Sequence, residues 1–429
     1  MALTIMVLSF TLFLLLGIPV IFSIGLCSLA TAVVAGLPLG VIFQKMVGGM
    51  QVFSFLAIPF FIFAGELMLH GGIADKIVNF AKASVGHVRG GLGMANVVAC
   101  TLFGGISGSA GADVSAMGAV LIPTMKKEGY DTDYAVNVTT HSALVGVLTP
   151  TSLNIIIFTL AAGGKVSVLE LILACILPAI VLTLCNLGAA YYVARKRGYP
   201  KGSWQGWDIV LRTFGSAAPG LFVVVLILGG ILSGIFTATE SAAIAVLYSL
   251  ILTALVYRSL SWDKFVESCA KSVKTTGVVL ALIGISATFG YFLTYFSVPE
   301  LVGEFMSSIS SSPWIIFLLV NIALFVLGTF LDMAPTILVC TPIFMPICQQ
   351  FGMEPAQFAV VMLLNCALGL NTPPVGTTQF IGCAIGGISV GEVMKSILPF
   401  YGSLVMAMLL ITYVPALSLW LPSLAAQGF

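Results

Sequence analysis

Charge is the property that this sequence has least of. Among its 429 residues only 8% are Asp, Glu, Lys or Arg and 59% are hydrophobic, whereas soluble domains contain about 25% charged residues. This composition excludes a water-soluble fold of this size and predicts a protein embedded in a lipid bilayer. The 17 basic and 16 acidic residues nearly cancel, so the net charge predicts no binding to nucleic acid.

Three sequence signatures are also absent. The nine cysteines form no CxxC pair and no His/Cys cluster, so we interpret them as small apolar side chains and expect neither disulfides nor a Cys/His metal site. The P-loop motif G-x-x-x-x-G-K-[ST] does not occur, which excludes ATP binding in that manner. The apolar N-terminus lacks the basic region of a secretory signal and exceeds its apolar length, which predicts a retained membrane helix.

Long runs without any charged residue predict the membrane spans. The first extends from Met1 to Gln44, and six more follow at 213–239, 241–257, 275–299, 305–331, 355–391 and 396–429. Each run is long enough to cross a hydrocarbon layer of about 30 Å as a helix.

The basic residues predict how these helices are oriented. Fifteen of the 17 lie in five short connections, at 76–89, 126–127, 195–212, 258–274 and Lys395. Placing these connections in the cytoplasm satisfies the positive-inside rule. The N-terminus is then expected in the cytoplasm and the C-terminus on the opposite, periplasmic side.

This orientation gives nine full spans and two hairpins. The spans are expected near 3–35, 51–70, 133–163, 167–194, 214–234, 240–257, 275–296, 357–387 and 393–423. Segments 90–125 and 313–350 each begin and end on one side of the bilayer, so we predict that they are re-entrant hairpins of opposite sense.

The two halves of the chain repeat each other at an offset of 223 residues. This offset aligns Gly105 with Gly328, Gly146 with Gly369, and the dipeptides 149–150 with 372–373, both Thr-Pro. Glycine and proline are fixed by backbone geometry, and the orientation places the two halves in opposite senses. Inverted repeats of this kind are typical of secondary transporters.

The tip of the first hairpin is the first candidate site. Residues 104–113 are rich in glycine and contain Ser107, Ser109 and Asp113, so we expect irregular backbone at membrane depth. Such backbone survives only where it lines a cavity or is buried in protein. Its carbonyls and hydroxyls are suited to a hard cation; the alternative is a close contact between small-residue helices.

Two proline breaks form the second candidate. Pro150 interrupts an apolar span, and Pro373 and Pro374 interrupt its counterpart in the second half. Each break leaves unpaired carbonyls before the proline, which can bind a cation. A new helix N-terminus follows the proline, and it can bind an anion. The alternative is a proline kink whose polar neighbours satisfy the backbone.

Single polar residues in apolar surroundings complete the candidates. Asp332 is the only charge between Glu304 and Glu354, so it is expected to be an ion ligand or proton carrier, or to cap a helix that begins near Pro335. The same alternatives apply to Asp113, which is expected to be either a functional carboxylate or a helix cap. Glu240 fits a capping box, and His141 fits helix packing better than a proton relay.

Three motifs stand in order along the chain, and together they resemble a known family. They are Phe-Gly-Gly-Ile-Ser-Gly-Ser-Ala at 103–110, Gly-Ile-Phe-Thr-Ala-Thr-Glu-Ser-Ala-Ala at 234–243 and Gly-Leu-Asn-Thr-Pro-Pro-Val-Gly at 369–376. Over essentially the whole chain, the sequence resembles the large membrane (M) subunit, of DctM or SiaM type, of tripartite ATP-independent periplasmic (TRAP) transporters.

The resemblance implies a fold and a function. The fold would be an all-α polytopic membrane protein with inverted repeats, two re-entrant hairpins and two interrupted helices, arranged as an elevator-type transporter similar to the ion transporter superfamily. The function would be sodium-coupled import of an organic acid, either sialic acid or a C4-dicarboxylate. The chain would not be an enzyme and would use no cofactor, with Na⁺ as the coupling ion.

Site residues follow from the same resemblance. One sodium ion would be bound by Ser107, Gly108, Ser109, Leu148, Thr149 and Pro150. A second would be bound by Gly328, Asp332, Asn371, Thr372 and Pro373. The substrate would lie between them, near Ser109, Asn154, Gly376, Thr377 and Thr378.

The resemblance also implies how the chain is divided. Scaffold helices of the first repeat would occupy 1–89, and the first hairpin and interrupted helix of the transport domain 90–165. Scaffold and linker helices would follow at 166–274, then a scaffold helix with an amphipathic arm at 275–312. The second hairpin and interrupted helix would occupy 313–388, and a C-terminal scaffold helix 389–429.

Two partners are implied in addition to the lipid bilayer and the organic acid. One is a small membrane subunit of four helices, expected as a separate polypeptide because this chain starts directly at its first helix. The other is a periplasmic substrate-binding protein. The location would be the bacterial inner (cytoplasmic) membrane.

Two other readings stay open at this point. A sodium/carboxylate symporter that works without a binding protein would share the same features, and adjacent genes for the two partners would distinguish it. An intramembrane serine hydrolase would pair Ser107 or Ser109 with His141, but neither serine lies in a G-x-S-x-G motif.

Overall fold

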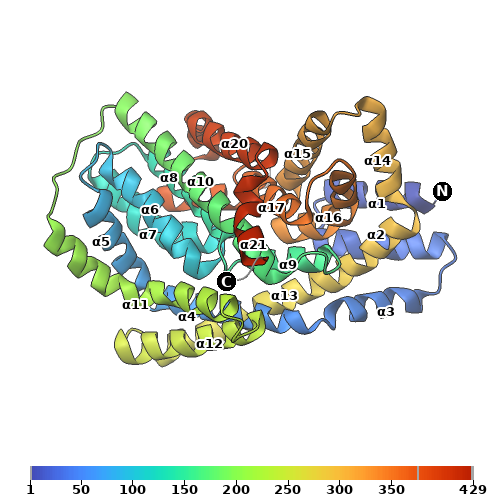
Figure 1. The fold of residues 1–429 in the computed structure, drawn as a ribbon, viewed down its shortest axis with the longest axis horizontal. Helices are drawn as coiled ribbons and strands as arrows, with labels where there is room; N and C mark the ends of the chain where they lie inside the picture. Colours follow the sequence, from blue (N-terminus) through green and yellow to red (C-terminus); the bar gives the residue numbers. More distant parts are fainter. Residues whose placement is uncertain (1, 374–375, 427–429) are drawn as a thin grey trace.

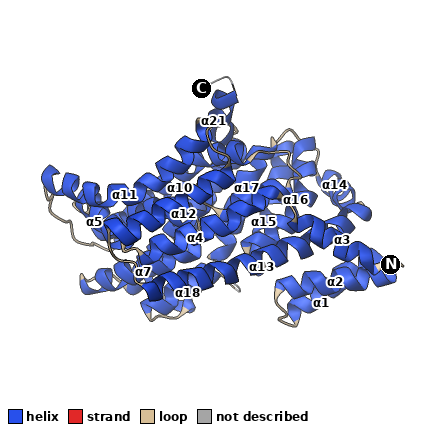
Figure 2. Ribbon diagram, turned by 90° about the horizontal axis from the view of Figure 1, so that it is seen from below, coloured by secondary structure: helices blue, strands red, loops and turns tan. Residues whose placement is uncertain are grey.

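The described part of the chain is mainly helical. The computed structural model describes residues 2–373 and 376–426, and within them it contains 21 α-helices and no strand. Among the helices of these described residues, six are long and apolar enough to cross a membrane, or nine if three bent pairs each count as one span. The predicted all-α membrane fold is therefore confirmed (Figures 1 and 2).

The N-terminal segment differs from the prediction of one span at 3–35. It forms two short helices, α1 (Ala2–Leu15) and α2 (Val20–Val34), which pack against each other. Gly17 takes a left-handed φ of 74° and Pro19 caps α2, so the chain reverses between them. The single span predicted here is wrong. Because the chain reverses, the N-terminus and residue 36 are expected on the same side of the bilayer and no longer on opposite sides.

The next segment of the first half begins with an amphipathic helix. Helix α3 (Leu39–Met50) packs on α13, and a short 3-10 turn leads into α4 (Ala57–His70). Helix α5 (Ile73–Val85) continues from α4 after a bend of 69°. The span predicted at 51–70 thus starts later and extends further than expected.

The predicted hairpin and interrupted helix of the first half are both present. Helices α6 (Gly91–Ser107) and α7 (Ala110–Lys127) pack side by side. Helix α8 (Thr132–Ala143) passes through a 3-10 turn at Leu144–Leu148 and continues, after a bend of 51°, as α9 (Leu153–Ala161). The long helix α10 (Val168–Lys196) follows.

The second half repeats this order after three linking helices. These are α11 (Trp207–Leu232), α12 (Ala238–Ile251) with a π turn at its end, and α13 (Trp262–Tyr295), followed by the amphipathic α14 (Val298–Ile309). The second hairpin pairs α15 (Pro313–Phe330) with α16 (Met333–Gln350), and the second interrupted helix consists of α17 (Pro355–Leu370) and α18 (Thr377–Gly386).

The C-terminal span is bent. Helix α19 (Val390–Met394) precedes α20 (Leu398–Tyr413), and α21 (Ala416–Ala426) departs from α20 at 53°. In Figure 1 the first hairpin lies on the left and the second on the right, with α10, α20 and α21 between them. Helix α10 contacts α6, α17 and α20, so it joins the two halves.

Local sequence explains several helix starts. Capping boxes begin α10 at Ser167, α12 at Thr237 and α19 at Ser389, each with a glutamate three residues later that binds back to the cap. The prediction that Glu240 caps a helix is therefore confirmed.

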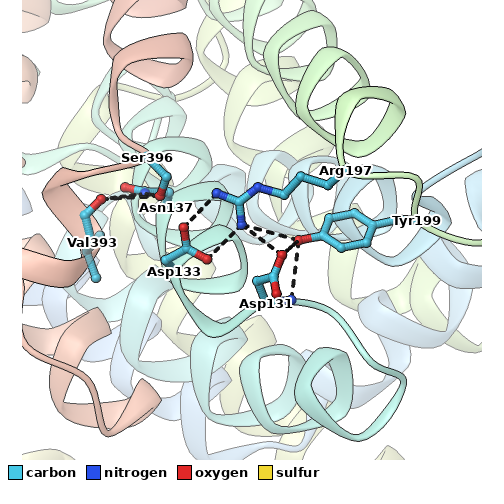
Figure 3. Close-up of polar contacts among 7 residues, drawn as sticks. All are labelled: Asp131, Asp133, Asn137, Arg197, Tyr199, Val393 and Ser396. Atoms are coloured by element: carbon cyan, nitrogen blue, oxygen red, sulfur yellow. Dashed lines mark hydrogen bonds and ion pairs between the residues drawn. The ribbon is translucent and has the colours of Figure 1, made fainter.

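A network around Arg197 holds the end of α10 against the start of α8 (Figure 3). Its guanidinium donates to both carboxylate oxygens of Asp133, at 2.8 and 2.7 Å, and to Asp131 at 2.9 Å. The hydrogen bonds that Arg197 donates to Asp133 raise the pKa of Arg197 above its usual value. One turn along α8, Asn137 donates to the Val393 carbonyl at 3.0 Å, which extends the network to the C-terminal helices.

Candidate functional site

The tip of the first hairpin is a sharp turn fixed by glycine. Helix α6 ends where Gly108 adopts a left-handed φ of 63° and donates its amide to the Gly104 carbonyl. Ser109 then caps α7. A β-carbon at Gly108 would collide with the backbone of Thr151. The tip therefore presses directly against the break in the first interrupted helix.

Threonine hydroxyls join the tip to the break. The Thr149 hydroxyl lies 2.8 Å from the Gly104 carbonyl oxygen and 2.7 Å from that of Gly146. The Thr151 hydroxyl donates to the Gly105 carbonyl at 3.1 Å. Backbone carbonyls at the end of α6 and hydroxyls of the break thus converge in a small buried space.

Asp113 places a carboxylate in the same space. It is fully buried, and the Ser107 hydroxyl donates to its Oδ1. Its Oδ2 has no hydrogen-bond partner, and a β-carbon on Gly104 would stand only 2.8 Å from it. A buried carboxylate oxygen without a partner is costly, so this arrangement is suited to a cation or a proton.

The second hairpin repeats this construction. Asp332 stands at the position equivalent to Ser109 in the 223-residue repeat, and its carboxylate accepts the Met333 amide at 2.9 Å at the start of α16. Gly328 lies against Gly369 so closely that a β-carbon at Gly369 would collide with the Gly328 backbone. Their counterparts Gly105 and Gly146 lie at the tip and the break of the first half.

The second break is held by polar side chains. Asn371 is fully buried and its Nδ2 has no partner. The Tyr401 hydroxyl donates to the Asn371 carbonyl at 2.7 Å and lies 2.9 Å from the Thr372 hydroxyl. Gly376, with a φ of 26°, precedes the first turn of α18. Pro374, the second proline predicted in this break, lies outside the described residues.

One cavity of about 450 Å³ brings both halves together. Seven of the 15 predicted site residues line it: Ser107, Gly108, Ser109, Asn154, Asp332, Thr377 and Thr378. Asn154 of α9 also donates to the sulfur of Met333 at 3.6 Å, which links the first half to the second hairpin tip. The other predicted residues do not line this cavity: Leu148, Thr149, Pro150, Gly328, Asn371, Thr372, Pro373 and Gly376.

The first turns of four helices line this cavity. They belong to α7 at 110–112, α9 at 153–154, α16 at 333–334 and α18 at 377–378. Helix N-termini carry unsatisfied amides and a positive dipole end, which favour anions. The cavity therefore offers backbone groups to an anion, although none of the described residues that line it is basic.

A further part of the cavity lining comes from α4 and α13 and was missed by the sequence analysis. It includes Glu66, Gly65 and Thr275. Glu66 is the only charged residue between Lys45 and Asp75, the same signal that identified Asp332, so it could have been found. Thr275 carries no such signal.

His141 does not face either hairpin serine. Its Nδ1 lies 2.8 Å from the Asn137 carbonyl oxygen, and its ring packs against Phe400 and Tyr401. Ser107 donates instead to Asp113. The geometry supports the packing role predicted for His141 and gives no nucleophile–base pair for a hydrolase.

Comparison with known proteins agrees with this architecture. The family model described as "Tripartite ATP-independent periplasmic transporter, DctM component" matches residues 7–417. The chain is 42% identical to the uncharacterized protein YgiK of Salmonella typhimurium, over 98% of this chain and 97% of that protein.

Two further relatives carry functional names. The C4-dicarboxylate TRAP transporter large permease protein DctM of Rhodobacter capsulatus is 33% identical, over 95% of this chain and 96% of its own length. The sialic acid TRAP transporter large permease protein SiaM of Vibrio cholerae is 34% identical, over 95% of each chain. Among solved structures, the YdaH transporter of Alcanivorax borkumensis superposes with a TM-score of 0.63 at 12% identity, over 90% of this chain and 88% of that one.

Proposed function

Because the chain belongs to the family of DctM components of tripartite ATP-independent periplasmic transporters, we propose that it is the permease of a sodium-coupled importer of an organic acid. Family membership makes it a multi-pass membrane transporter component and not an enzyme. The observation that carries the proposal is the cavity lined by four helix N-termini from both repeats.

The first sodium ion is proposed to bind where the first hairpin tip meets its break. The predicted ligands Ser107, Gly108, Ser109, Leu148, Thr149 and Pro150 belong to these two segments. We add Asp113, because its unpartnered Oδ2 faces the same space. Carbonyl, hydroxyl and carboxylate oxygens are the ligands expected for a hard cation.

The second sodium ion is proposed for the equivalent place in the second half. Its predicted ligands are Gly328, Asp332, Asn371, Thr372 and Pro373. The close approach of Gly328 to Gly369 and the carbonyl of Asn371 support this assignment. Asp332 lines the cavity as well, which supports a position between the proposed ion and the proposed substrate.

The substrate is proposed to occupy the cavity between these two sites, near Ser109, Asn154, Gly376, Thr377 and Thr378. An anion there is held by helix N-termini and hydroxyls, with bound sodium to balance the two carboxylates of the cavity, Glu66 and Asp332. The names of relatives indicate a sialic acid or a C4-dicarboxylate.

Transport is proposed to follow an elevator mechanism. The moving body comprises the hairpins and interrupted helices of 90–165 and 313–388, and α4 and α13 form the wall that it slides past. We also assign α10 and α20 to the moving body, instead of the scaffold regions 166–274 and 389–429 expected from the sequence. They pack against α8 and α17, so they are expected to move with them.

The partners are proposed to be a small four-helix membrane subunit and a periplasmic binding protein, in the bacterial inner membrane. We propose that the C-terminus lies on the periplasmic side, as the charge-based topology predicts. Because α1 and α2 reverse the chain, we now place the N-terminus on the same side as Lys45, which is the periplasmic side in the charge-based topology.

The test is uptake into proteoliposomes that contain this chain with both partners. We expect uptake of an organic acid to require a sodium gradient, and Asp113→Asn to weaken its sodium dependence. Glu300→Gln is a matched control, because Glu300 lies on α14 outside the cavity. Uptake that is independent of sodium in the unmodified protein would contradict the proposal.

A further inference from the structure

Glu66 belongs to an ion-pair cluster between α4 and α13. Its Oε2 lies 3.9 Å from His70 Nδ1 and 3.9 Å from Lys271 Nζ. Lys271 also pairs with Glu267 at 3.2 Å, and His70 Nε2 lies 3.7 Å from Glu267. The Glu66 carboxylate is thus held by His70 of its own helix, α4, and by Lys271 of α13.

The same carboxylate faces the substrate cavity. Glu66 lines the cavity and its side chain is 23% exposed. The buried oxygen is Oε2, which has no hydrogen-bond partner and faces the two basic groups. Its neighbour Gly65 lies against the Ser107 carbonyl at the first hairpin tip. The cluster therefore fixes a carboxylate in the lining of the cavity that also contains the four helix N-termini.

We propose that Glu66 is a specificity-determining residue that accepts a hydrogen bond from a hydroxyl group of the substrate, so that this permease prefers hydroxylated organic acids. The inference rests on the proposed function, since it assumes that an organic acid enters this cavity. Glu267 holds the same cluster together but does not line the cavity.

The chemistry of the groups that line the cavity is the reason for proposing a hydroxylated acid. The acid group of the substrate is attracted to the four helix N-termini and repelled by Glu66 and Asp332. A hydroxyl donates to a carboxylate in a charge-assisted hydrogen bond. An acid with hydroxyl groups along its chain satisfies both the helix N-termini and Glu66, whereas a plain dicarboxylate places a second negative charge near Glu66 or leaves Glu66 without a donor.

The test compares two six-carbon dicarboxylates, galactarate and adipate, which differ only in their hydroxyl groups. Their affinities for the purified complex of permease and small subunit are measured by calorimetry in detergent with saturating sodium. We expect galactarate to bind at least about tenfold more tightly, because hydrogen bonds to charged groups contribute that much or more. Glu66→Gln should reduce this ratio to about threefold or less.

Glu267→Gln is the control for the cluster. It removes a partner of Lys271 without changing the cavity wall, so the galactarate-to-adipate ratio should stay as in the unmodified protein. Equal affinities for both acids in the unmodified protein, an unchanged ratio in Glu66→Gln, or the same loss in Glu267→Gln would overturn the inference. Failure of both acids to bind at any sodium concentration would also overturn the inference, whereas the proposed function is overturned separately, by uptake of organic acids that does not depend on sodium.

Discussion

Replacing Arg197 by glutamine tests what joins α10 to the first interrupted helix. The substitution removes the two hydrogen bonds to Asp133 and the one to Asp131. Asp133, whose side chain is 21% exposed, then keeps its charge near the start of α8 without a cationic partner. The stability of the folded protein should fall as a result.

The size of the loss in folding stability follows from the burial of the Arg197–Asp133 pair. Exposed ion pairs contribute about 0–1 kcal/mol, and breaking a fully buried pair costs about 3–5 kcal/mol. The Arg197 side chain is 27% exposed, which is between these limits, so we expect Arg197→Gln to cost about 2 kcal/mol. Asp131 is 58% exposed, and Asp131→Asn should cost only about 0.5 kcal/mol.

Thermal unfolding of the purified protein in detergent measures the difference. Arg197→Gln should lower the unfolding temperature by about 2–5 °C, and Asp131→Asn by less than about 1 °C. Arg197→Lys should fall between them, because an ammonium cannot form the two-pronged contact with Asp133. If Arg197→Gln matches Asp131→Asn or leaves the unfolding temperature unchanged, the network does not stabilise the fold and the reasoning from burial is wrong.

Three further substitutions test the site. Gly369→Ala should separate the second hairpin from α17 and reduce the yield of monodisperse protein on size exclusion, because its β-carbon would collide with backbone; Gly402→Ala, with open space around it, should not. Asp332→Asn should reduce the sodium dependence of uptake in proteoliposomes, and a curve that matches Glu300→Gln would count against its role. Tyr401→Phe removes hydrogen bonds to the second break and should cost about 1 kcal/mol, seen in thermal unfolding; no change would mean that the break is held by other contacts.

Charge and glycine patterns predicted the first hairpin well for a physical reason. This segment is bounded by basic residues on both sides, so it is expected to return to the side where it began, and Gly108 allows the tight left-handed turn that this requires. The breaks at Pro150 and Pro373 were also predictable, because proline removes a helical hydrogen bond.

Other features left no comparable signal or were passed over. The reversal between α1 and α2 occurs inside a run without charge, where the charge-based topology carries no information, although Gly17 and Pro19 marked the turn. Glu66 was predictable, because it is the only charged residue between Lys45 and Asp75. Its pairing with Lys271 depends on how α4 and α13 pack, which spacing along the chain does not determine.

The paired helices α1 and α2 also set a condition on the surrounding lipid. With 14 and 15 residues they are about 21 and 23 Å long, which is shorter than a hydrocarbon layer of about 30 Å. Side chains such as Leu8, Leu15 and Phe22 are exposed on them, and no charged residue before Lys45 is present to snorkel to the interface. A bilayer that these two helices cross therefore has to thin beside them, or a second chain has to cover them, to resolve the hydrophobic mismatch.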